Sequence, residues 1–351
     1  MAAMSGPGNG ENARRARVTI REIADLAGVS IATVSRVVNG RDDVSEETRE
    51  AVQRIVRERG YSANRSARGL SAGRTGFVGV TVPMVNPPYF SSILSGAAEA
   101  LDELDMRIVL CPTLHQHDRE VSLLERLMHG TTDGALLILP EETNDELEVL
   151  LHHGYRFVVV DPLKRLEHRI PGVSSANTAG ADQAMRHLLD LGHRRIGAIT
   201  GPSGWFATEE RRRGYHAALA AHGIMPLPEF EVEGDFQISG GVTSGGQLLD
   251  LPERPTAIFA FNDNLAIGAM QAARARGLRV PEDVSIVGFD DTELAEVVTP
   301  GLTTVRQPLA EMGRMAVSLL GRALENHRFE PVHVELATRL VVRSSTQRLD
   351  P

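Results

Sequence analysis

The sequence predicts an α/β protein in which three short helices precede a larger body built on parallel sheets. Two observations predict this class. Residues 18–60 carry apolar side chains at the spacing of short amphipathic helices. From residue 75 onward, short apolar runs alternate with helical stretches, which is the pattern of parallel sheets covered on both faces. A chain of 351 residues also exceeds one ordinary domain, so two or three are expected.

The first predicted helix follows Thr19 and ends at Gly28. Thr19 can cap the helix, and Glu22 three residues later completes a capping box. A glycine tolerates the left-handed turn that ends a helix, so the chain turns at Gly28. The apolar stripe of this helix consists of Ile20, Ile23, Ala24 and Ala27.

The second predicted helix begins after Ser30, a residue type that caps helices. Its inward face carries Val34, Val37 and Val38. Its outward face carries Ile31, Ala32, Thr33, Ser35 and Arg36. Two short helices joined by a glycine turn form a helix-turn-helix, whose second helix enters the major groove of DNA. A helical hairpin in an unrelated core is the alternative interpretation of these residues alone.

A third helix is predicted after Ser45, its expected cap, where two glutamates suit the positive end of the helix dipole. Val52, Ile55 and Val56 form its buried stripe, and Gly60 ends it. Residues 61–70 could add about two turns of helix, but so short a helix is marginal alone in water. We interpret them as a linker that becomes helical only when something else stabilises it.

The charge of the chain is divided between its two parts. Residues 1–75 hold 13 arginines against 9 acidic residues, whereas the other 276 residues hold 24 basic side chains against 37 acidic ones. The positive charge therefore lies with the helix-turn-helix, where neutralisation of DNA phosphates requires it, although the net charge of the whole chain is −9.

Composition excludes several classes of protein. No apolar run approaches the length of a membrane span, and none follows the arginines of residues 1–17 as a secretory signal requires. We therefore expect a cytoplasmic protein that does not engage a membrane. Cys111 is the only cysteine, which excludes an internal disulfide. His115 and His117 resemble a metal pair, but no third ligand suggests itself, so we expect neither a metal nor another cofactor.

The larger body is expected to contain strands at short apolar runs. These runs are residues 77–82, 107–111, 135–139, 157–160, 196–200, 257–261 and 285–289, with a last strand at 334–342. Helices are expected between most of them, for example at 176–191 and 210–221. Ligands of such folds bind beyond the carboxyl ends of the strands.

Polar and aromatic side chains follow several of these strands. The polar ones are Asp161, Asn262, Asp263, Asp290 and Asp291, and the aromatic ones are Tyr89, Phe90, Trp205 and Phe206. Strand ends that converge on such groups predict one pocket. Strand-end Asp and Asn residues also serve as helix caps, so each residue taken alone is equally compatible with a structural role.

Three motifs occur together in the first 70 residues. They are Val-Ser-x-x-Thr-Val-Ser-Arg-Val-Val-Asn-Gly from residue 29, Val-Ser-x-x-Thr-Arg from residue 44 and Gly-Tyr-x-x-Asn-x-x-Ala-x-x-Leu from residue 60. In combination they resemble the LacI/GalR family of bacterial repressors, and the resemblance continues over nearly the whole chain. It implies a three-helix DNA-binding headpiece and a hinge helix, followed by a periplasmic-binding-protein-like domain of two subdomains with parallel sheets.

The resemblance implies that the linker is a hinge helix that folds when two subunits meet on an operator. Asn64 and Ala67 belong to its motif, and Leu70 matches a leucine wedged into the minor groove at the operator centre. The alternative is that Leu70 packs on its own protein. Ile31 and Ala32 match the positions that select the operator, and Arg36 can pair with guanine. The expected phosphate and supporting contacts are Thr19, Ser30, Thr33, Ser35, Asn39, Ser45 and Thr48.

The resemblance also implies an effector site in the larger body. Its expected polar contacts are Asp161, Arg211, Asn262 and Asp290, with Gln307 as a further lining residue. Phe236 matches an aromatic residue that lies against the face of a sugar, and Trp205 can add a second aromatic surface. Tyr89 and Phe90 complete the expected lining. Polar groups around an aromatic face favour a saccharide, although purine-binding members use the same frame.

We therefore predict four segments: a disordered tail at 1–17, the headpiece at 18–62, the hinge at 63–74 and an effector-binding and dimerisation domain at 75–345. One subdomain is expected at about 75–162 plus 293–325, and the other at about 163–292 plus 326–342.

The predicted function is a homodimeric, non-enzymatic transcription factor. It is expected to bind near-palindromic double-stranded operator DNA, to repress genes of carbohydrate uptake and catabolism, and to respond allosterically to a small saccharide. Alternatives are a global catabolite regulator with a protein corepressor, a repressor that responds to a purine or another small molecule, and a transport protein or sugar-processing enzyme with a vestigial headpiece. The sequence leaves open the identity of the effector and whether it releases or tightens DNA binding.

Overall fold

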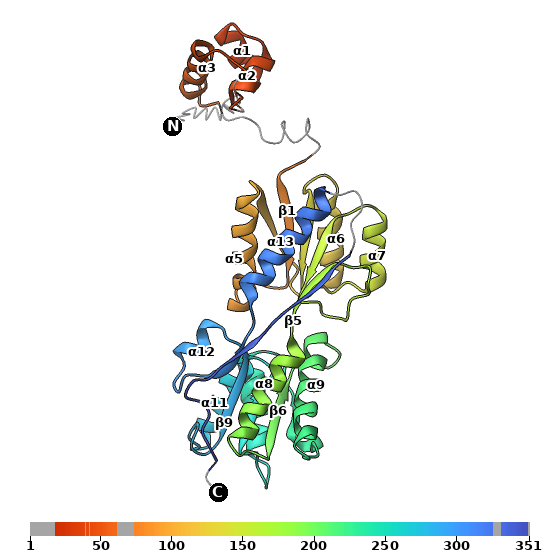
Figure 1. Cartoon of the computed structure of the whole chain (residues 1–351), viewed down its shortest axis with the longest axis vertical. Coiled ribbons are helices and arrows are strands. Elements are labelled where there is room, and N and C mark those ends of the chain that lie inside the picture. Colours follow the sequence, from red (N-terminus) through yellow and green to blue (C-terminus); the bar gives the residue numbers. More distant parts are fainter. Residues whose placement is uncertain (1–17, 39, 42, 62–73, 326–330, 350–351) are drawn as a thin grey trace, which may run out of the picture. The chain divides into compact units, whose positions relative to one another are not determined.

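A computed structural model describes residues 18–38, 40–41, 43–61, 74–325 and 331–349 (Figure 1). The chain divides between Thr75 and Gly76 into a small helical unit and a larger α/β unit. The predicted tail at residues 1–17 and most of the predicted hinge lie outside the described residues.

The small unit consists of α1 (Ile20–Ala27), α2 (Ile31–Val38) and α3 (Glu46–Glu58). Their buried core is Ile23, Ala24, Val34, Val37 and Val52. The predicted capping box of α1 is confirmed: the Glu22 amide donates to Thr19 Oγ1 at 3.3 Å, and the Thr19 amide donates to Glu22 Oε2 at 2.7 Å. Gly28 ends α1 with a φ of 63°, in the left-handed region that favours glycine. The turn between α1 and α2 is therefore encoded locally.

The two serines predicted as caps behave differently. Ser30 Oγ accepts a hydrogen bond from the Thr33 amide at 3.1 Å and so caps α2. Ser45 is the N-cap residue of α3, as predicted, but its side chain makes no capping hydrogen bond to the backbone. Its hydroxyl donates to Thr48 Oγ1 at 2.9 Å.

The larger unit contains two six-stranded sheets. The first has the order β11-β5-β4-β3-β1-β2, and all its neighbouring strands are parallel. Its strands are β1 (Phe77–Val82), β2 (Arg107–Pro112), β3 (Gly134–Ile138), β4 (Phe157–Val160), β5 (Gly172–Ser175) and β11 (His333–Leu336). The predicted fold class, an α/β protein with parallel sheets behind N-terminal helices, is confirmed.

The second sheet has the order β12-β10-β9-β8-β6-β7, and only β12 runs antiparallel to its neighbour. Its strands are β6 (Ile196–Thr200), β7 (Glu231–Glu233), β8 (Ala257–Ala260), β9 (Ser285–Asp290), β10 (Thr303–Arg306) and β12 (Arg339–Val341).

Helices cover the faces of both sheets. They are α5 (Pro88–Glu103), α6 (His117–Met128), α7 (Asn144–His152), α8 (Asn177–Asp190), α9 (Phe206–Ala221), α10 (Ile238–Leu249), α11 (Asp263–Ala275), α12 (Glu293–Val297) and α13 (Leu309–Glu325), with a short 3₁₀ turn at Pro228–Phe230. None of these helices is long and apolar enough to cross a membrane.

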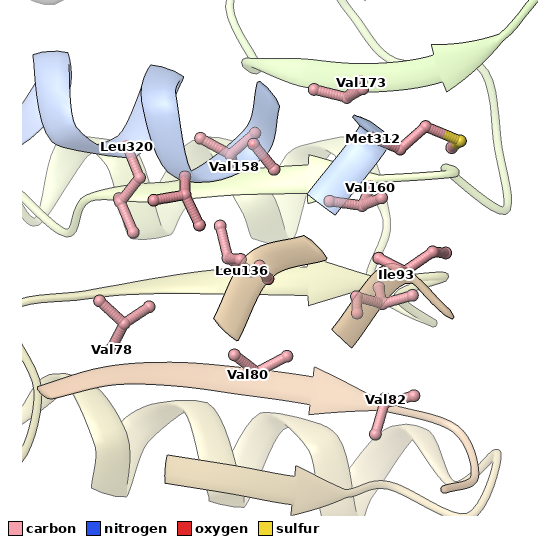
Figure 2. Packing of buried hydrophobic residues seen from close by; sticks show 14 of the residues in the cluster. Val78, Val80, Val82, Ile93, Leu136, Val158, Val160, Val173, Met312 and Leu320 are labelled. Atoms are coloured by element: carbon pink, nitrogen blue, oxygen red, sulfur yellow. The ribbon is translucent and has the colours of Figure 1, made fainter. Parts of the chain in front are cut away.

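The core of the first sheet explains why its strands read as continuous apolar runs. Ile93 of α5 and Met312 and Leu320 of α13 pack over strand residues such as Leu136 and Val158, all of them buried (Figure 2). Helices on both faces leave no strand face for water, so polar alternation disappears from β1, β3 and β4.

Some predicted elements need correction. The expected strand at 334–342 is two strands: β11 pairs with β5 in the first sheet, and β12 pairs with β10 in the second. The chain changes sheet at the two residues between them, where the Thr338 hydroxyl donates to the carbonyl oxygen of Ala176. β5, β7 and β10 were missed because they are short and half polar.

The predicted subdomain boundaries also differ from the sheets. β5 and β11 belong to the first sheet and β10 to the second, whereas the prediction placed each of them in the other subdomain. The chain passes from one sheet to the other after β5, after β10 and after β11. Apolar patterning identifies a strand but not its sheet, because its partners are distant in sequence.

The contact between α5 and α13 predicts opposite effects for two glycine substitutions. A Cβ atom at Gly96 would lie 1.9 Å from the carbonyl oxygen of Ala310, so Gly96→Ala should destabilise the larger unit by about 1–3 kcal/mol. The matched Gly321→Ala on α13 meets nothing closer than 3.8 Å and should stabilise by up to about 1 kcal/mol, because alanine favours helix. Thermal unfolding of both variants checks this; equal effects would contradict the packing of these helices.

Candidate functional site

A cleft in the larger unit lies where carboxyl ends of strands from both sheets meet. Its lining comprises Met84, Pro87, Pro88, Tyr89, Phe90, His115, Leu139 and Asp161, with Trp205, Ala207, Arg211, Asp235, Phe236, Gln237, Asn262, Asp263, Asn264, Asp290 and Thr292. The first eight residues follow strands β1 to β4 of the first sheet, and the others belong to the segment between β6 and α12. The strand ends that the sequence singled out therefore do converge on one cavity.

Tyr89 and Asp161 form the polar wall contributed by the first sheet. The Tyr89 hydroxyl donates to Asp161 Oδ2 at 2.5 Å, and Asp161 is buried directly after β4. Burial raises the pKa of Asp161, while the hydrogen bond from Tyr89 and the charge of Arg211 act in the opposite direction. Burial and the charge of Asp161 likewise raise the pKa of Tyr89 well above its ordinary value. The tyrosine therefore stays a hydrogen-bond donor.

Arg211 is held in the cleft by contacts on several sides. Its Nε donates to Asn177 Oδ1 at 2.8 Å, and Nη1 donates to the carbonyl oxygen of Phe261. The guanidinium carbon lies 3.9 Å from the centre of the Phe289 ring, a cation–π contact. Nη2 is 3.9 Å from Asp290 Oδ1. These contacts fix a buried guanidinium in place before any ligand arrives.

Asp290 is positioned from behind by Gln307. Gln307 Nε2 donates to Asp290 Oδ1 at 2.6 Å, and Gln307 Oε1 accepts from the Ser175 hydroxyl at 2.5 Å. Gln307 is buried and is not among the lining residues of the cleft, so its predicted role as a lining residue needs correction. Its amide is already occupied by Ser175 of one sheet and Asp290 of the other. Gln307 acts on the cleft through Asp290.

Asn262 and Asp263 combine capping with cleft lining. Asn262 Oδ1 accepts from the Leu265 amide at 2.8 Å, which caps α11, and its Nδ2 donates to the carbonyl oxygen of Phe236 at 3.1 Å. Asp263 accepts from the Thr292 amide at 2.7 Å and from the Thr304 hydroxyl at 2.5 Å. Burial nevertheless raises the pKa of Asp263 to about 7. The structural and functional interpretations of these strand ends are therefore compatible.

Aromatic rings line the rest of the cleft. The Trp205 and Phe236 rings lie 5.5 Å apart, and the His115 ring lies 6.3 Å from Trp205. His115 was considered in the sequence only as a metal ligand, but it lines the cleft, and its position just after β2 was the available signal. Among the described residues, no three His, Cys, Asp or Glu side chains are placed to hold a metal ion.

Several residues that line the cleft have a strained backbone conformation. Leu139, Asp161, Phe236, Asp290 and His115 all have positive φ angles, between 50° and 120°. Such conformations cost free energy and persist where the surrounding structure imposes them, commonly at binding sites.

The predicted recognition helix presents the expected face. Ile31, Ala32 and Arg36 are exposed on α2, and Thr33 and Ser35 are half-buried. Arg36 Nε lies 3.1 Å from Asp43 Oδ2, and both side chains remain more than half exposed. Thr19, Ser30 and Ser45 are also exposed, and Thr48 is half-buried. Asn39, Asn64, Ala67 and Leu70 lie outside the described residues.

Comparison with known proteins agrees with both parts of the chain. Residues 19–64 match the family model of bacterial regulatory proteins of the lacI family, and residues 185–346 match that of the periplasmic binding protein-like domain. The HTH-type transcriptional regulator CelR of Thermobifida fusca is 38% identical over 340 residues, which cover 95% of this chain and 99% of that protein.

Two solved structures resemble the whole chain. The CelR–cellobiose complex has a TM-score of 0.73 at 37% identity and covers 94% of this chain and 100% of its own. The lac repressor dimer bound to operator and the anti-inducer ONPF has a TM-score of 0.85 at 29% identity, over 95% of this chain and 100% of its own.

A helix-turn-helix unit followed by a two-sheet body with a polar cleft defines a ligand-responsive transcriptional regulator. The chain belongs to the LacI family of bacterial regulatory proteins.

The buried carboxyl groups predict how stability depends on pH. Burial raises the pKa of Asp290 well above its ordinary value, so folding favours its protonated form. The stabilisation that the Asp290 carboxyl group gives to the fold is fully present below the ordinary carboxyl pKa. It is lost as the pH rises through the raised pKa. Asp290→Asn keeps an acceptor for Gln307, so without ligand it should stabilise the protein at pH 7 by about 0.5–2 kcal/mol and much less at pH 4.

Thermal unfolding between pH 4 and pH 8 measures this difference. Asp250→Asn is the matched control. Arg276 lowers the pKa of the exposed Asp250, so replacing this carboxylate should destabilise the protein at neutral pH rather than stabilise it. An Asp290→Asn variant less stable than the wild type at neutral pH would show that the ionised carboxylate stabilises the fold.

Proposed function

We propose that this regulator binds operator DNA through α2 and that a neutral saccharide in the cleft controls this binding. The observation that carries the proposal is the composition of the cleft: one buried arginine, several buried carboxyl groups and an amide line it together with aromatic rings. Carboxylates, amides and guanidinium groups make paired hydrogen bonds to neighbouring hydroxyls. Trp205 and Phe236 supply flat apolar surfaces for the C–H face of a sugar ring.

The charge of the cleft favours a neutral ligand. Asp161, Asp235, Asp263 and Asp290 line it, whereas Arg211 is the one arginine or lysine among its lining residues in the described chain. Hydroxyls can form hydrogen bonds with these carboxyl groups whether the groups are protonated or ionised, whereas a phosphate or carboxylate on the ligand would be repelled by each carboxyl group that ionises and would pair only with Arg211. Cellobiose, the ligand in the CelR complex, is a neutral saccharide, which supports the same class for this chain.

Control of DNA binding follows from linkage. A ligand that touches Tyr89 and Asp161 on the side of the first sheet and Arg211 and Asp290 on the side of the second binds best in one arrangement of the two sheets. If that arrangement favours or disfavours the DNA-bound form, ligand and operator change each other's affinity by the same factor. Gln307 joins Ser175 of the first sheet to Asp290 of the second, so it lies on this route.

The DNA side of the proposal rests on α2. Arg36 is exposed and can exchange Asp43 for the O6 and N7 atoms of guanine, while Ile31 and Ala32 can contact thymine methyl groups. The lac repressor in the operator complex is a dimer, and two copies of this headpiece would read a near-palindromic site. Thr19, Ser30, Thr33, Ser35, Ser45 and Thr48 are proposed to contact phosphates or support α2. The roles of Asn39, Asn64, Ala67 and Leu70 remain predictions from the sequence.

The proposed role is repression of carbohydrate uptake and catabolism genes in the cytoplasm, without enzymatic activity. A regulator that depends on a protein corepressor would bind its operator tightly only with that partner and would ignore saccharides. A purine-responsive repressor would be stabilised by purine bases rather than by sugars. A saccharide panel tested by thermal shift and then by operator binding separates these alternatives.

Arg211 and Arg212 form a matched pair for testing the effector site. Arg212 is a neighbour on α9, but it pairs with Glu209 and Glu231 outside the cleft. Arg211→Ala should weaken saccharide binding about a hundredfold, because it removes charge-assisted hydrogen bonds, and it should abolish the operator response. Arg212→Ala should retain both. Saccharide and operator titrations measure them; parallel loss of operator affinity in Arg211→Ala would assign Arg211 a structural role.

Arg36→Ala tests the recognition helix. Loss of a bidentate guanine contact should reduce specific operator binding by about 1–3 kcal/mol while non-specific binding falls much less. Arg57→Ala removes the same charge from an exposed position on α3 and serves as the control. Fluorescence anisotropy with operator and scrambled DNA gives the specificity ratio. An unchanged ratio in Arg36→Ala would exclude base reading by this arginine.

A further inference from the structure

A second hollow lies on the first-sheet side of the larger unit, between α6 and α7. Its lining comprises Val121, Leu124, Glu125, His129, Glu142, Asp145, Glu146, Val149, Leu150, His153 and Tyr155. We call it the α6–α7 groove. It shares no lining residue with the cleft. Leu124 and Leu150 connect its apolar floor to the cluster that contains Leu137, Leu147 and Phe157.

The polar residues of the α6–α7 groove are predominantly acidic. Four carboxyl groups line it, from Glu125, Glu142, Asp145 and Glu146, and no lysine or arginine occurs among its lining residues in the described chain. An apolar groove with a negative rim favours a cation that also carries an apolar body.

The buried carboxyl group of Glu142 lacks a hydrogen-bond partner among the described residues. It is 5% exposed, and neither of its carboxyl oxygens accepts a hydrogen bond from another described residue. Glu146 differs, because it accepts from the Thr143 amide at 2.8 Å and lies 3.0 Å from His117 Nε2. A buried carboxyl group without a partner is costly. Burial, with the nearby charge of Glu120, raises the pKa of Glu142 to about 8.

Aromatic rings stand at the same groove. The Tyr155 ring centre lies 6.1 Å from that of His129 and 6.3 Å from that of His153, with the second pair nearly perpendicular. The face of the Tyr155 ring can attract an organic cation. A metal ion is a poorer candidate, since no three metal-ligating side chains are suitably placed among the described residues.

We propose that the α6–α7 groove binds a small organic cation, a primary ammonium on an apolar body, whose charged end pairs with Glu142. The apolar body lies over Val121, Leu124 and Val149, and the ammonium supplies the hydrogen-bond donors that both oxygens of Glu142 lack. This site is independent of the saccharide proposed for the cleft.

Ionisation of Glu142 gives this proposal a distinctive signature. At pH 7 the carboxyl group of the empty groove is mostly protonated, and pairing with an ammonium requires the carboxylate. Binding should therefore release about one proton at pH 7, and affinity should rise from pH 7 to pH 8.5. The groups that face Glu142 are the carboxylates of Glu120, Glu125, Glu141, Asp145 and Glu146, with His129 and His153. The charges of Glu120, Glu146 and Glu141 oppose the ionisation of Glu142 in the empty site.

Isothermal titration calorimetry of the full chain with 2-phenylethylammonium tests the proposal. The neutral 2-phenylethanol has the same shape without the charge and should bind roughly tenfold or more weakly. Glu142→Gln should reduce ammonium binding by a similar factor and remove the proton release. Asp145→Asn at the exposed rim should cause a smaller loss. Glu148→Gln removes a carboxylate from the same helix outside the groove and should bind as the wild type does.

Three outcomes would overturn the proposal: no saturable ammonium binding to the wild type, equal binding of the alcohol, or unchanged binding and proton release in Glu142→Gln. The Arg211→Ala variant distinguishes the two sites. Its ammonium binding should equal that of the wild type even though its saccharide binding is weakened about a hundredfold. Failure of the saccharide proposal leaves the groove test unaffected.

Discussion

The cleft is organised around one buried guanidinium among buried carboxyl groups. Arg211 is fixed by Asn177, by the Phe261 carbonyl and by the Phe289 ring, and it faces Asp290 at 3.9 Å rather than at the distance of a close ion pair. The positive charge is therefore in place but incompletely neutralised. A ligand with several hydroxyls can bridge such groups and take over the hydrogen bonds that the protein leaves unmade. In the function that we propose, binding specificity follows from this incomplete pairing.

The same buried polar groups reduce the folding stability of the ligand-free protein. Asp161, Asp263 and Asp290 have raised pKa values because burial opposes their ionisation, and several of the surrounding residues have positive φ angles. The packing of the two sheets offsets this loss of stability. Valines and leucines of β1, β3 and β4 pack without exposure under α5 and α13, and the second sheet has its own buried clusters. A rigid framework thus holds a strained polar centre, as functional sites commonly require.

Much of this arrangement could be predicted from the sequence. The capping box at Thr19, the turn at Gly28 and the apolar strands at 77–82, 157–160 and 196–200 depend on local chemistry, so their residues encode them directly. The rule that ligands bind beyond the carboxyl ends of the strands also located most of the cleft. Gln307, which follows β10 but does not line the cleft, shows the limit of that rule. Whether a residue after a strand lines the cleft or lies behind it depends on partners such as Ser175, which come from the other sheet.

The crossing strands were less predictable for a related reason. β5 and β10 contain Ser and Thr residues that weaken the apolar signal, and β11 and β12 read as one strand although they join different sheets. Glu142 was not recognisable at all, since only the packed structure shows that its carboxyl group is buried without a partner. Long-range pairing and burial, rather than local propensity, decide these features.

The central claim is that the cleft selects a neutral polyhydroxyl ligand because its carboxyl groups outnumber its one arginine. Thermal unfolding of the wild type with neutral saccharides and with their uronic acid counterparts tests this claim most directly. We predict that one or more neutral saccharides raise the unfolding temperature and that the carboxylate counterpart of each leaves it nearly unchanged. Stabilisation by the acidic sugar equal to or greater than that by the neutral one would contradict the account.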